Sequence, residues 1–79
     1  MREEKPTVHF AVCLNNEGYR ASLEVGKLYR VVPDAEAEAN DLIRVVDESG
    51  EDYAFSAARF RAVELPPDVE RALLAASRA

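Results

Sequence analysis

Two residues near the start of the chain, His9 and Cys13, have side chains that can bind a metal ion or act as a base and a nucleophile. They are four residues apart and therefore share one face of a regular strand. A structural zinc site takes four ligands, and catalysis by a thiolate needs a base and an oxyanion donor within reach. No motif in the sequence supplies these further groups. The pair therefore favours a surface histidine and an inert thiol, and we expect no metal ion, no cofactor and no catalytic residue.

Four carboxylates lie close together between Asp47 and Asp52. Such a cluster can hold a cation or raise the pKa of its members. Its spacing matches no calcium-binding loop, and the tips of hairpins are often acidic because they are solvated. The segment therefore predicts a hairpin turn, with Ser49 and Gly50 as turn-forming residues, rather than a metal site.

Amide and phenol side chains make up the candidate ligand-binding set: Asn15, Asn16, Tyr19 and Tyr53. A tyrosine ring exposed beside Tyr19 would form an aromatic and amide surface suited to a peptide or another subunit. The alternative is that both tyrosine rings fill the core of a small protein. The sequence leaves this choice open, because a phenol can pack its ring and keep its hydroxyl in water.

The composition sets limits on the class of protein. A chain of 79 residues makes one domain, and its net charge of -5 repels phosphate backbones, so we expect no nucleic-acid partner. No apolar run approaches the roughly 20 residues that span a bilayer, so we expect no membrane partner. A single cysteine, Cys13, and no recognisable signal peptide predict a cytoplasmic protein.

Alternation and turn residues predict five short strands. In the first strand, Val8, Phe10, Val12 and Leu14 form one face, whereas His9, Ala11 and Cys13 form a polar face. Pro6 precedes this strand and ends a charged leader from Met1 to Pro6. The strands are expected at Thr7 to Leu14, Leu28 to Val32, Leu42 to Asp47, Asp52 to Ser56 and Arg61 to Glu64, with a helical turn over Ser56 to Phe60. The alanine-rich acidic segment from Asp34 to Asp41 is expected to be a mobile connection. Three aromatic residues are assigned to the core: Phe10, Phe55 and Phe60.

A helix is predicted from Pro67 to Ala79, because proline is favoured at the first helical position and apolar residues then recur with helical spacing. We expect Val69 and Leu73 to touch the strands, Leu74 to stay accessible and the last turn to fray. The chain thus divides into a β domain at residues 1–66 and a C-terminal helix at residues 67–79.

Two segments and one aromatic residue resemble a family of small uncharacterised bacterial proteins. They are the run CLNNEGYRASLEVGKLY from Cys13 to Tyr29, the run DESGEDYAF from Asp47 to Phe55, and the closing Phe60. The resemblance extends from about Val12 to Pro66. Together with the order of the expected elements, it implies a mainly β fold: a small five-stranded SH3-like barrel with a short C-terminal α-helix. In SH3-like folds the long first loop forms one wall of a surface groove, which places Asn15, Asn16 and Tyr19 there. Peptide-binding domains of this fold usually have a tryptophan in the groove, and this chain has none.

These observations favour a non-enzymatic module that binds a protein or peptide partner. The alternative is a small structural or regulatory subunit that docks through its C-terminal helix. We expect the chain to be a monomer or a weak homodimer.

Overall fold

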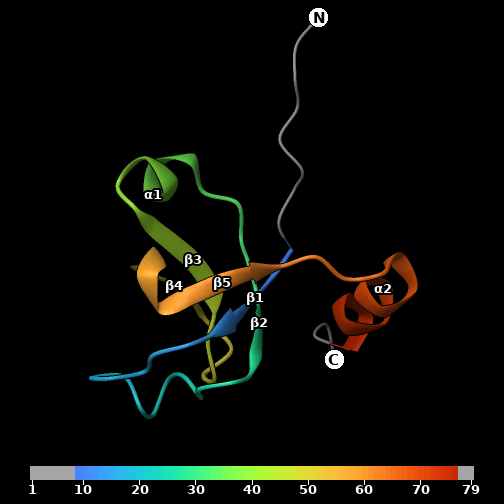
Figure 1. Cartoon of the computed structure of the whole chain (residues 1–79), viewed down its shortest axis with the longest axis horizontal. Coiled ribbons are helices and arrows are strands. Elements are labelled where there is room, and N and C mark those ends of the chain that lie inside the picture. The colour runs from blue at the N-terminus through green and yellow to red at the C-terminus, as the bar shows by residue number, and fades with distance from the viewer. Residues whose placement is uncertain (1–8, 77–79) are drawn as a thin grey trace, which may run out of the picture.

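The computed structural model describes residues 9–76. The predictions for the leader Met1 to Pro6, for Thr7 and Val8 of the first strand, and for the helix end at residues 77–79 lie outside the described residues. The elements are β1 (Phe10–Cys13), β2 (Leu28–Arg30), α1 (Ala35–Ala39), β3 (Leu42–Val46), β4 (Asp52–Ser56), the 3₁₀ turn η1 (Ala57–Arg59), β5 (Phe60–Val63) and α2 (Pro67–Ala76). The fold is thus small and rich in strands, with a helix at the C-terminal end (Figure 1).

The strands form two sheets. One has the order β2-β1-β5, and the other is the hairpin of β3 and β4. All neighbouring strands are antiparallel. An isolated bridge between Val31 and Val45 links the sheets, and the Val32 amide donates to the Arg44 carbonyl at 2.8 Å. The strands of residues 9–76 do not close into a barrel, so the expected barrel is not found. Pro33 follows β2, and the η1 turn separates β4 of one sheet from β5 of the other.

The hairpin of β3 and β4 and the helical turn before β5 confirm the predicted positions of these elements. The Gly50 amide donates to the Asp47 carbonyl at 3.0 Å, and Gly50 has a φ of 88°. Glycine adopts this left-handed conformation without steric cost, which explains why the chain reverses there.

The core lies between the two sheets. Phe10, Phe55 and Phe60 are all buried, as predicted. The predicted polar face of β1 is wrong, however, because Ala11 and Cys13 are fully buried whereas Leu14 is exposed. β1 is the central strand of its sheet and is covered on both faces. The small side chains of Ala11 and Cys13 fill the space towards the second sheet. A pattern of large apolar residues does not predict their burial.

The segment expected to be a mobile connection contains the short helix α1. The Asp34 side chain caps this helix by accepting from the Ala37 amide at 3.0 Å, and its other oxygen lies 2.7 Å from Arg44 Nε of β3. Ala37 is buried. A helix this short is not stable alone. Its stability comes from the Asp34 cap, from the ion pair with Arg44 and from the burial of Ala37.

The α1 cap predicts a stability that depends on pH. The hydrogen bond from Arg44, with the amide of Ala37, holds the pKa of Asp34 below its ordinary value of 3.8. A carboxyl whose pKa is lowered on folding stabilises the protein fully above that ordinary value, and the contribution is lost as the pH falls through the lower folded value. We expect Asp34→Asn, which keeps a capping oxygen, to be less stable than the wild type at pH 6 and nearly equal at pH 2. Urea unfolding across this range checks the expectation. A stability difference that stays constant across the range would contradict it.

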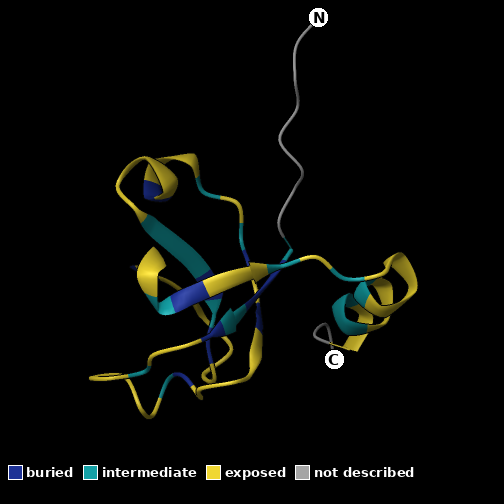
Figure 2. Ribbon diagram, in the orientation of Figure 1, coloured by how far each residue is buried: buried dark blue, intermediate teal, exposed yellow. Residues whose placement is uncertain are grey.

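Helix α2 stands beside the first sheet and has no fully buried residue (Figures 1 and 2). Val69, expected to pack, is exposed, and Leu74, expected to be accessible, is half-buried like Leu73. The half-buried face therefore runs along Glu70, Leu73 and Leu74. Glu70 Oε2 lies 2.6 Å from His9 Nδ1, so this face of α2 carries a polar contact, which a pattern of apolar residues does not reveal.

Candidate functional site

A long loop between β1 and β2 carries three of the four predicted ligand-binding residues. It is held in place by the two asparagines predicted from the sequence. The Asn15 side-chain oxygen accepts from the Glu17 amide at 2.8 Å, and Asn16 Nδ2 donates to the Leu23 carbonyl at 3.0 Å. Leu23 is only 1% exposed and anchors the loop in the core. The loop is therefore an ordered element, and the amide nitrogen of Asn16 is used within it.

The ring of Tyr19 packs between the loop and the rest of the fold. Its centroid is 5.1 Å from that of Phe55, in a T-shaped arrangement, and the guanidinium carbon of Arg59 lies 4.7 Å from the Tyr19 centroid. Arg59 Nη1 also donates to the Asn15 carbonyl at 3.2 Å, and the Leu14 amide donates to the Arg59 carbonyl at 2.7 Å. Four residues are thus brought together, and we call them the Tyr19 surface: Leu14, Asn15, Tyr19 and Arg59.

The Tyr19 surface remains accessible even though its parts contact one another. The exposed fractions are 51% for Leu14 and 44% for Tyr19, and Arg59 is half-buried. Figure 2 shows the loop as a largely exposed extension at one end of the molecule. An exposed aromatic ring and a guanidinium are groups that protein interfaces favour.

Tyr53, the fourth predicted residue, lies on β4 next to the acidic turn and not on the Tyr19 surface. Its ring is 47% exposed, and its hydroxyl donates to Glu51 at 2.8 Å, which raises the pKa of Tyr53. Arg59, by contrast, was not predicted as a binding residue. It is 40 positions from Tyr19 in the sequence, so no local pattern could have paired the two.

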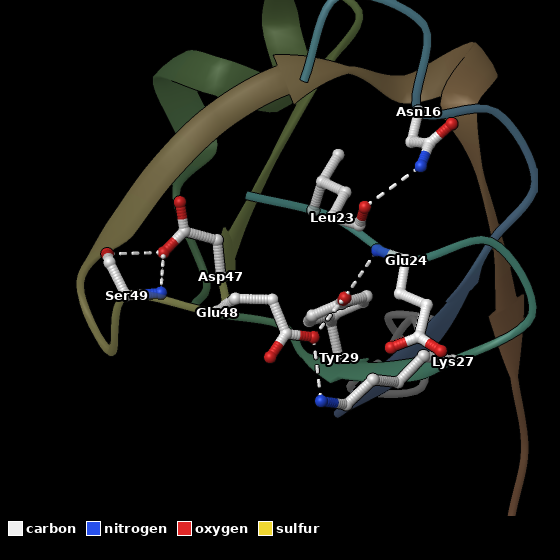
Figure 3. Close-up of polar contacts among 8 residues, drawn as sticks. All are labelled: Asn16, Leu23, Glu24, Lys27, Tyr29, Asp47, Glu48 and Ser49. Carbon is white, nitrogen blue, oxygen red and sulfur yellow. Dashed lines mark hydrogen bonds and ion pairs between the residues drawn. The ribbon is translucent and has the colours of Figure 1, made fainter. Parts of the chain in front are cut away.

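A second polar group joins the loop to the hairpin (Figure 3). The Tyr29 hydroxyl accepts from the Glu24 amide at 2.7 Å and donates to Glu48 at 2.6 Å, and Lys27 Nζ lies 2.7 Å from the same Glu48 oxygen. Lys27 and Tyr29 lower the pKa of Glu48, while burial, followed by the bond to Glu48, raises the pKa of Tyr29. Both capacities of the hydroxyl are satisfied inside the protein, so this group holds segments of the fold together.

His9 and Cys13 do not form a site with each other. The Cys13 side chain is in the core, whereas His9 faces Glu70 of α2. Within residues 9–76 there is no group of three or more histidine, cysteine, aspartate or glutamate side chains that could hold a metal ion. The same residues contain no helix of the length and apolar character needed to cross a membrane.

A groove of about 630 Å³ lies between α2, β2 and the turn of the β3–β4 hairpin. Apolar residues of α2, β2 and the neighbouring ends of β1 and β3 line it: Phe10, Leu28, Tyr29, Val46, Leu73 and Ala76. Charged residues of both signs complete the lining, namely Lys27, Arg30, Asp47 and Glu48. Its mixed charge and open apolar wall do not select one kind of ligand.

In comparisons with known proteins, no family model, no curated protein and no solved structure matches this chain. The case for a function therefore depends on the geometry and chemistry of the surfaces described above.

Proposed function

We propose that the chain is a non-enzymatic binding module that takes a protein or peptide partner on the Tyr19 surface. The fold we propose for it is an SH3-like arrangement of strands, as the family resemblance implies. The order of the elements supports this, since a long first loop, a tight hairpin and a 3₁₀ turn before the last strand occur in sequence.

One observation carries the proposal: Tyr19 is nearly half exposed although its ring is held from two sides, by Phe55 and by Arg59. A ring fixed in this way loses little conformational freedom on binding, so more of its contact energy is available for a partner. Tyrosine and arginine are also the residue types that most often dominate the energy of protein interfaces.

The test is affinity purification of the tagged full-length protein from its native host, followed by mass spectrometry, with three variants compared. We expect Tyr19→Ser to lose a partner that the wild type retains. Tyr53→Ser is the matched control, because Tyr53 is exposed to the same degree and its hydroxyl is bonded to Glu51 rather than to a residue of the Tyr19 surface, and we expect it to retain that partner. Loss of the partner with Tyr53→Ser but not with Tyr19→Ser would overturn the proposed surface.

A second candidate function is docking through α2, as a small structural or regulatory subunit. The observation that favours it is that no residue of this helix up to Ala76 is fully buried. The third variant, Val69→Ser, changes an exposed residue of α2 and separates the two functions. A partner lost only with Val69→Ser would support docking through the helix.

A further inference from the structure

We infer that the Tyr19 surface recognises a carboxylate, supplied by an aspartate or glutamate that lies next to an apolar residue in the partner. This inference rests on the proposed function and adds the chemical class of the segment that is bound. It follows from the unpaired charge of Arg59, from the way this side chain is held, and from the apolar groups near it.

In the part of the chain that the structure describes, Arg59 is a positioned cation without an acidic partner, although the chain is rich in acids. The sequence has 15 aspartates and glutamates against 10 lysines and arginines. Within residues 9–76, Lys27 pairs with Glu48 and Arg44 pairs with Asp34, whereas five arginines form no ion pair: Arg20, Arg30, Arg59, Arg61 and Arg71. Among these five, Arg59 is the one whose side chain is held by other groups, through hydrogen bonds to Asn15 and a contact with the Tyr19 ring. Its hydrogen bonds are from Nη1 to the Asn15 carbonyl at 3.2 Å and to the Asn15 side-chain oxygen at 3.5 Å. A guanidinium has five N–H donors, so most of those on Arg59 are left for a ligand.

The guanidinium is held in place before any ligand arrives. It lies over the Tyr19 ring at 4.7 Å and is tied to Asn15 through one nitrogen. A planar fork fixed in this way matches a carboxylate in a bidentate geometry and gives up little side-chain entropy when it binds. The contact with Tyr19 therefore orients Arg59 as well as stabilising it.

Apolar area next to the charge defines the rest of the ligand. Leu14 is half exposed, and its amide is bonded to the Arg59 carbonyl, so the backbones of the two residues are neighbours. The ring of Tyr19, a residue that is 44% exposed, lies under the Arg59 guanidinium. An apolar residue beside the bound acid would cover this area, which explains why we infer an acidic residue with an apolar neighbour.

A peptide carboxylate fits these observations better than the phosphates of a nucleic acid. Single-stranded nucleic acids bind by stacking bases on open aromatic faces, but Arg59 covers one face of Tyr19 and Phe55 packs against the ring. A nucleic acid also carries a charge at every phosphate and would be repelled by the net charge of -5, whereas a peptide with one carboxylate meets far less repulsion.

The test is a selection of random seven-residue peptides displayed on phage against the immobilised full-length protein. We expect enriched peptides to share an aspartate or glutamate beside an apolar residue. For the strongest synthetic peptide, changing that acid to its amide should weaken binding at least about tenfold, as expected for the loss of a charge-assisted hydrogen bond. Arg59→Gln should cause a similar loss, and the two changes together should cost no more than either alone.

Arg61→Gln is the matched control, because it removes the same charge from β5, two residues away. We expect it to bind like the wild type. The change within the peptide leaves the protein intact, so the inference stays testable even if Arg59→Gln is unstable. Enriched peptides that lack an acid but need Tyr19 would overturn the inference and leave the proposed function standing. The absence of any enriched peptide would overturn the inference, and the purification with Tyr19→Ser would still decide the proposed function. If an oligothymidylate of ten nucleotides bound as tightly as the strongest peptide, or more tightly, the surface would prefer phosphate. This result too would overturn the inference.

Discussion

Phe60→Ala should leave the protein mostly unfolded at physiological temperature. Phe60 is buried where β5 begins, and its ring centroid lies 6.3 Å from that of Tyr29 and 6.1 Å from that of Phe55. These rings come from β2, β4 and β5, so Phe60 joins the two sheets. Truncating a buried phenylalanine to alanine costs about 3 to 5 kcal/mol. Small domains have stabilities near the lower end of the range of about 5 to 15 kcal/mol, so the loss removes most of the stability.

Thermal unfolding followed by circular dichroism measures this effect. Tyr53→Ala is the control, since it removes an aromatic ring of similar size from an exposed position. We expect it to change the free energy of unfolding by no more than about 1 kcal/mol. Native-like melting of Phe60→Ala would show that the ring does not hold the sheets together.

Leu23→Ala should be the second most damaging change, with a loss of about 2 to 5 kcal/mol in the free energy of unfolding. Leu23 is 1% exposed and belongs to the same core cluster as Phe60. It is also a fixed point of the loop between β1 and β2: its amide donates to the Tyr19 carbonyl at 2.9 Å, and its carbonyl accepts from Asn16. The truncated side chain leaves a cavity under the loop that carries the Tyr19 surface.

Urea unfolding of Leu23→Ala measures the loss, and Leu14→Ala is the matched control. Leu14 has the same side chain but is 51% exposed, so its truncation should change the free energy of unfolding by less than about 1 kcal/mol. Equal losses from the two leucines would mean that Leu23 is not the anchor of the loop.

The sequence alone determined those elements that depend on neighbouring residues. The β3–β4 hairpin, the helical turn before β5 and the first residue of α2 were all predicted at or within one residue of their observed positions. Each depends on a local signal: Gly50 for the turn, alternation along the strands and Pro67 for the start of the helix. The burial of Phe10, Phe55 and Phe60 was predicted too, because large aromatic side chains are rarely left in water in a domain this small.

The tertiary structure decided what depends on residues far apart in the chain. Helix α1 forms because Asp34 meets Arg44, and β1 buries Ala11 because a second sheet covers that face. The same holds for the candidate site, where Tyr19 and Arg59 meet only once the first loop lies against the η1 turn. Periodicity and turn propensity depend on the nearest few residues of the chain. Packing then selects among the arrangements that these local preferences allow. The surface that we propose as the binding site is therefore visible only in the folded chain.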